Sequence, residues 1–113
     1  DVPLAAKLEE RFKKTVLIND IIELGSATRV ATLQAMTKKD AALLDVPLAN
    51  FPNITQKLDE LQPITRQEAN LRQLAAIRKA ADAYKAGIAG LQEGWRGLDA
   101  LAKTRLAVAN EVL

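Results

Sequence analysis

Arg29 has the clearest capacity for chemistry in this sequence, because its guanidinium group interrupts the most apolar part of the first predicted helix. Thr28 stands beside it and Thr32 follows three residues later, so two hydroxyl groups accompany the cation. A guanidinium group holds a carboxylate through two parallel hydrogen bonds, and a buried one needs a compensating anion. Two interpretations stay open: an internal ion pair with Glu68 or Asp82, or a site for a small anionic ligand.

Arg78 and Tyr84 lie in the segment that we expect to face Arg29. Arg78 stands at the edge of an apolar stripe and could pair with Asp82 one turn later; as a second cation it would instead make a pocket selective for carboxylates. Tyr84 lies on the stripe, so its ring is expected in the core, and its hydroxyl needs a partner or a cavity. The candidate ligand-binding residues are Arg29, Thr28, Thr32, Arg78 and Tyr84.

Composition excludes several kinds of site. The chain has no His and no Cys, which rules out a zinc site with these ligands, a histidine acid or base, a thiol nucleophile and a disulfide. No nucleophile with a base and no paired carboxylates are recognisable, so we expect neither an enzyme, nor a cofactor, nor a metal site. Sixteen Lys and Arg against fourteen Asp and Glu are interspersed and leave a net charge of +2, which argues against nucleic-acid binding.

The fold class is all-α. Apolar residues make up 49% of the 113 residues but aromatics only 4%, a composition suited to interlocking helices. From residue 74 to 112 an apolar seam recurs every three or four residues, the spacing of a helix packed against a neighbour in a bundle. Its members are Leu74, Ile77, Ala81, Tyr84, Ile88, Leu91, Trp95, Leu98, Ala102, Arg105, Ala109 and Val112.

A second stripe of small residues runs beside this seam. It contains Ala80, Ala83, Gly87, Gly90, Gly94, Gly97, Leu101, Thr104 and Val108. Each glycine inside a helix costs up to about 1 kcal/mol relative to alanine, so their alignment predicts the close approach of another backbone. This helix is therefore expected to have packing partners on two sides.

The first helix should begin at residues 2–4 and also carries two stripes. One holds Leu4, Leu8, Thr15, Ile18, Ile22, Gly25, Arg29, Thr32 and Met36; the other holds Leu17, Ile21, Leu24, Thr28, Ala31 and Ala35. We expect residues 18–36 to be largely buried. The pattern fades near residue 44, and Pro47 and Pro52 predict a loop over residues 45–53.

A short helix is expected next, capped by Asn53 or Thr55 and ended by Pro63. Thr65 followed by Glu68 fits a capping box for the last helix, which should run from Thr65 to Leu113. These elements predict an antiparallel hairpin of two long helices with a short connecting helix, forming an up-down helical bundle by itself or with a partner chain. In that hairpin both termini lie at one end.

Three segments resemble the extracytoplasmic sensor domains of bacterial methyl-accepting chemotaxis proteins, of the four-helix-bundle or helical bimodular type. LINDIIELGSATRVATLQAMTKKDAALL is similar to their first helix, IRKAADAYKAGIAGLQEGW to a later helix, and LDVPLANFPNITQKLDEL takes the place of the membrane-distal connection. The resemblance covers most of the chain. It implies that Arg29 and Thr32 match the ligand-facing part of the first helix, while Arg78 and Tyr84 match more loosely.

The resemblance implies a function in chemotaxis and signal transduction. Residues 1–113 would be a helical sensor module excised from a larger transmembrane receptor, on the periplasmic side of the inner membrane. It would bind an organic acid or amino acid and signal by helix displacement. Such sensors have four long helices, whereas this chain predicts two and a short one, so either two chains form a homodimeric bundle or the chain is half of a longer module. The alternative is a structural helical-hairpin or coiled-coil interaction module without a small-molecule ligand.

Overall fold

A computed structural model describes residues 3–112, and over this range the chain forms helices and turns without a β-strand. Leu113, the expected end of the last helix, lies outside the described range, as do residues 1 and 2. The elements are α1 (Leu4–Lys38), the 3₁₀ helix η1 (Ala41–Leu44), α2 (Asp45–Leu48), α3 (Asn50–Leu61), the 3₁₀ helix η2 (Gln62–Ile64) and α4 (Glu68–Val112). The predicted all-α class, with two long helices and shorter ones between them, is confirmed.

The first turn of the chain begins at Lys39, where α1 ends. Lys39 adopts a left-handed conformation with φ 52°, and its N–H donates to the carbonyl of Met36 while that of Asp40 donates to Ala35. This arrangement satisfies carbonyls that a helix end leaves without partners. The Asp40 carboxylate then accepts from the N–H of Ala42 at 3.0 Å and caps η1.

The loop predicted over residues 45–53 is wrong, because this segment is almost entirely helical. Pro47 and Pro52 each occupy the third position of a helix, in α2 and α3 respectively. Backbone N–H groups in the first helical turn have no carbonyl partner within the helix, so a proline there removes no hydrogen bond. Asn53 and Thr55, expected as caps, therefore lie inside α3.

Pro63 follows the end of α3 as expected, but α4 begins at Glu68, three residues later than predicted. Thr65 has an extended backbone, and its hydroxyl donates to the carbonyl of Leu61 at the end of α3, at 2.7 Å. The predicted capping residue thus completes the preceding helix.

The core is built around α3. Its buried side chains, Phe51, Ile54, Leu58 and Leu61, recur every three or four residues and form one face. They pack against Leu17 and Ala35 of α1, Leu44 of η1, and Leu74 and Ile88 of α4. Both long helices therefore bury apolar surface against the same central helix.

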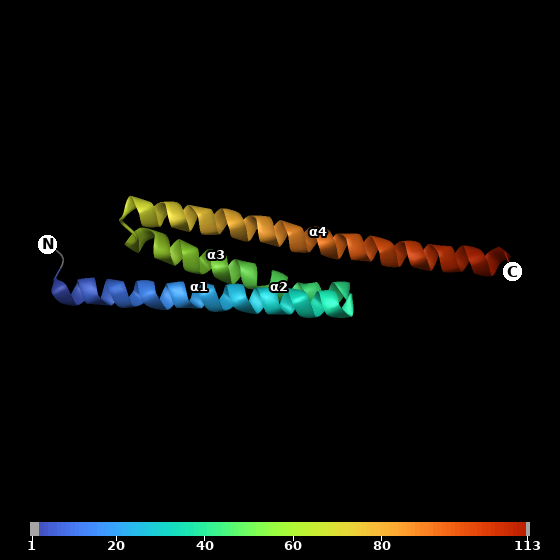
Figure 1. The fold of residues 1–113 in the computed structure, drawn as a ribbon, viewed down its shortest axis with the longest axis horizontal. Helices are drawn as coiled ribbons and strands as arrows, with labels where there is room; N and C mark the ends of the chain where they lie inside the picture. Colours follow the sequence, from blue (N-terminus) through green and yellow to red (C-terminus); the bar gives the residue numbers. More distant parts are fainter. Residues whose placement is uncertain (1–2, 113) are drawn as a thin grey trace.

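The two long helices run in the same direction, because η1, α2 and α3 together return the chain between them (Figure 1). Arg66, just before α4, pairs with Glu10 near the start of α1 at 3.1 Å, while Gln92, far along α4, contacts Ala41 just after α1. Each long helix thus forms its antiparallel hairpin with α3. The expectation that both termini lie at one end is wrong: they lie at opposite ends of a molecule 82 Å long.

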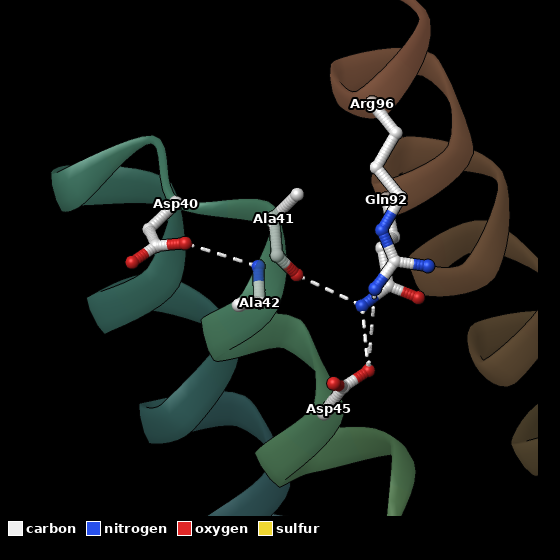
Figure 2. A network of polar contacts seen from close by, with 6 residues as sticks. All are labelled: Asp40, Ala41, Ala42, Asp45, Gln92 and Arg96. Carbon is white, nitrogen blue, oxygen red and sulfur yellow. Dashed lines mark hydrogen bonds and ion pairs between the residues drawn. The ribbon is translucent and has the colours of Figure 1, made fainter. Parts of the chain in front are cut away.

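A polar network fixes α4 against the turn after α1 (Figure 2). The buried side chain of Gln92 donates from Nε2 to the Ala41 carbonyl at 2.8 Å and to the Asp45 carboxylate at 2.7 Å. Arg96, one turn further, approaches the same carboxylate at 3.9 Å. Since Gln92 and Arg96 lie on the same side of α4, the network sets both the register and the rotation of this helix.

Burial on α1 is narrower than expected for residues 18–36. The stripe containing Leu17, Thr28 and Ala35 packs against the rest of the chain, whereas Ile22 of the other stripe is 60% exposed. The small stripe of α4 is also open, since a Cβ added at Gly87, Gly90, Gly94 or Gly97 would meet no atom within 4 Å. The close approach predicted from the glycines is therefore not made within the described chain.

Candidate ligand-binding groove

An open groove of about 430 Å³ lies between α1 and α4. It exists because both helices pack on α3 while the glycine and alanines that line it, Gly25, Ala80 and Ala81, leave the space between them unfilled. Phe51 and Ile54 of α3 also line it, with Ile22 of α1 and Ile77 and Tyr84 of α4 on the two sides. The resulting surface is mostly apolar.

Arg29 lies in this groove, one turn after Gly25 on α1. Its expected burial is wrong: the side chain is exposed, because the part of its stripe from Ile22 to Arg29 faces the open groove. Within residues 3–112 it forms no ion pair, and neither acid expected as its partner contacts it; Glu68 pairs with Arg72 at 2.7 Å instead. The guanidinium group therefore stays solvated and keeps its donors available to an incoming anion.

Thr28 lines the groove, but its hydroxyl already serves the fold. It donates to the Leu24 carbonyl at 2.6 Å and accepts from Nδ2 of Asn50 at 3.1 Å, which ties α1 to the start of α3. Thr32 is buried and donates to the Thr28 carbonyl at 2.7 Å; it does not line the groove. Both threonines use the bond to the carbonyl four residues earlier that is common for hydroxyls inside helices.

Arg78 and Tyr84 separate onto different surfaces. Arg78 pairs with Asp59 of α3 at 2.9 Å and donates to Gln62 at 3.3 Å, so the expected pairing with Asp82 is replaced by a contact between helices. It does not line the groove. Tyr84 does, and its ring lies 6.1 Å from that of Phe51 in a tilted arrangement. Of the predicted site residues, the structure brings together Thr28, Arg29 and Tyr84.

The groove continues toward the start of α1 in a second section of about 320 Å³. The two sections share Ile21, Ile22 and Ile77, and the second reaches Lys14. Lys14 and Arg29 are the charged residues that line the two sections, and both are cations. Along its length the groove is thus apolar with a positive charge near each end, which suits an anion attached to an apolar body.

Sequence reasoning missed Lys14 and Phe51. Lys14 precedes Ile18 and Ile22 at four-residue intervals, so helical periodicity could have placed it on the groove face. Phe51 could not be placed in this way, because its segment was expected to be a loop. Its position depends on α3 starting at Asn50.

The described residues contain no group of three or more acidic side chains placed to hold a metal ion. Every buried side-chain nitrogen or oxygen in this range has a hydrogen-bond partner. Among the described helices, none has the length and hydropathy needed to cross a bilayer.

No protein-family model matches the chain, and neither curated proteins nor solved structures give a significant match. The resemblance to chemoreceptor sensor domains is therefore a prediction from sequence pattern alone.

Proposed function

We propose that this chain is the ligand-sensing module of a bacterial chemoreceptor, acting on the periplasmic side of the inner membrane. It binds a small anionic metabolite, an organic acid or amino acid, in the groove between α1 and α4. The observation that carries the proposal is the position of Arg29, a guanidinium group without an ion pair in the described chain on the wall of an apolar groove. The sequence resemblance to chemoreceptor sensors supports the same function.

The ligand's carboxylate binds the guanidinium fork of Arg29 through two hydrogen bonds, which fix its orientation. Its apolar part covers Ile22, Ile77 and the ring of Tyr84. This contact stabilises the complex, because it removes apolar surface from water. The bound molecule bridges α1 and α4, whose main contacts run through α3 and the turn after α1. A ligand that prefers one spacing of the two helices shifts their equilibrium, which is the displacement that signals.

A thermal-shift screen of organic acids and amino acids tests the proposal. A ligand present at about 100 times its dissociation constant adds roughly 2.7 kcal/mol of stability. Arg29→Ala should abolish this stabilisation, and Arg29→Lys should recover part of it, because a point charge lacks the guanidinium fork. Lys13→Ala is the matched control, since Lys13 is exposed on α1 and lies outside the groove. If no acid stabilises the wild type, or if Arg29→Ala responds equally, the sensor proposal is wrong.

A structural interaction module is the second candidate, and one observation favours it. Apolar side chains remain exposed along both long helices, among them Ile22, Met36, Leu98 and Leu106. A helix with an unpartnered apolar stripe is typical of a chain that packs against another helix. The two functions differ in the screen, because an interaction module does not respond to small acids.

A further inference from the structure

The groove is open to solvent along its length, and α4 extends past the other helices at the end of the molecule opposite the start of α1 (Figure 1). We call residues 97–111 the C-terminal overhang; every side chain in it is exposed. Its face formed by Leu98, Leu101, Ala102, Arg105, Leu106 and Ala109 is a shallow apolar surface. Within residues 3–112, the groove is thus open and about as long as a helix segment, and the overhang has no packing partner.

We propose that the C-terminal overhang of a second copy of this chain fills the groove and completes a four-helix bundle. The overhang is roughly 23 Å long and the groove spans a similar length along α1, from Lys14 to Arg29, at 1.5 Å per residue. The inserted helix runs antiparallel to α1 and α4 and parallel to α3, which gives the up-down order of antiparallel bundles.

Two-fold symmetry requires this antiparallel orientation, because a parallel insertion would repeat head to tail without closing. The groove offers Arg29 at one end and Lys14 at the other. The overhang carries Asp99 beside its apolar face, three residues before Ala102 and seven before Leu106, while Arg105 lies on that face and Glu111 lies on the other side of the helix. Placing the partner's Asp99 beside Arg29 therefore gives this cation an acid.

The same register positions the symmetry axis. Tyr84 of α4 lines the groove beside Arg29, so the partner's Asp99 is also opposite Tyr84. The two α4 helices therefore cross midway between positions 84 and 99, which lies between Gly90 and Gly94. These glycines have open space around them, which lets two backbones approach. A two-fold axis at this point gives both copies the same contact, so each overhang fills the other copy's groove. The glycine stripe, the groove and the overhang are then explained by one interaction.

The inference holds whether or not the groove binds a metabolite. If it does, the ligand's carboxylate and the partner's Asp99 compete for Arg29. Ligand binding then weakens the insertion of the partner helix, which adds a movement between the two copies to the change in the spacing of α1 and α4.

Charge reversal in the full chain tests this dimer by sedimentation equilibrium. We expect a wild-type dimer at micromolar concentration, and Arg29→Glu or Asp99→Arg alone should raise its dissociation constant at least about tenfold, because each variant places like charges together. The double variant Arg29→Glu/Asp99→Arg should return to near the wild-type value. Lys13→Glu and Asp82→Arg are matched controls, exposed on the same helices away from the groove, the overhang and the crossing of the two α4 helices. A monomer, or a dimer indifferent to the swap, overturns the inference.

Introduced cysteines give a second, independent measurement, because the natural chain has none. The register pairs Ile22 with the partner's Leu106, so Ile22→Cys/Leu106→Cys should form intermolecular disulfides under mild oxidation. Met36→Cys/Leu106→Cys is out of register by fourteen residues, or roughly 21 Å, beyond the reach of a disulfide. Equal cross-linking of the two pairs would contradict the proposed register. Neither experiment involves a ligand, so their failure would leave the sensor proposal to its own test.

Discussion

At the scale of single residues, polar side chains that are hydrogen-bonded or paired within the fold differ from those that remain available to bind a ligand. Thr28, Thr32 and Gln92 are buried and hydrogen-bonded within the chain, so their roles are accounted for by the fold. Arg78 is committed to Asp59. Arg29 differs from all of these because it remains solvated beside apolar surface.

Gln92→Leu should lower the free energy of unfolding by about 1–3 kcal/mol. The substitution keeps the volume but removes the Gln92 donor from the carbonyl of the buried Ala41, whereas the exposed Asp45 carboxylate keeps Arg96. A buried acceptor without a partner costs this much. Urea denaturation measures the effect. Gln34→Leu is the control, because Gln34 is exposed on α1 and its replacement should change stability by no more than about 0.5 kcal/mol. Equal effects of the two substitutions would show that the network in Figure 2 contributes nothing to stability.

At the scale of helices, α3 holds the molecule together although it is far shorter than α1 or α4. Both long helices bury their apolar contacts against it, and ion pairs join it to each: Lys57 to Asp20 of α1 at 3.4 Å and Asp59 to Arg78 of α4 at 2.9 Å. These pairs are partly exposed, so they contribute less than the packing does. The groove exists because α3 separates the helices that line it.

Leu58→Ala should destabilise the chain by about 2–5 kcal/mol, because Leu58 is only 1% exposed at the centre of the core and its truncation leaves a cavity. Thermal or urea unfolding followed by circular dichroism gives the change. Val30→Ala provides the comparison, since Val30 is 51% exposed on α1 and should change stability by about 0.5 kcal/mol or less. Comparable losses at both positions would mean that α3 is not the centre of the fold.

At the scale of the whole molecule, stability should differ along α4. Up to Trp95 the helix has partly or fully buried residues, whereas from Arg96 to Glu111 every residue is exposed. A helical segment without tertiary contacts opens at low cost in free energy. The two ends of this single helix should therefore respond differently to any probe of local unfolding.

Limited trypsin digestion of the dilute chain should cut after Lys103 and Arg105 before it cuts after Lys57 or Arg78, because the latter two are held by ion pairs beside the core. Mass spectrometry of early fragments identifies the order. At concentrations that favour the dimer, the first two sites should become protected as the overhang inserts into the partner. Early cleavage after Arg78 would show that α4 is not more stable near the core.

The sequence by itself determined the secondary structure class, the two long helices, the chain break at Pro63 and the angular position of each side chain. Helical periodicity is a local property, so the two stripes of α1 and the placement of Arg29 beside Gly25 followed from spacing alone. Tertiary structure decided which stripe is buried, because that depends on the neighbour rather than on the helix. It also decided the helix directions. Pro47 and Pro52 permit either a loop or a first helical turn, and the helical turns let α2 and α3 together return the chain and leave the groove open.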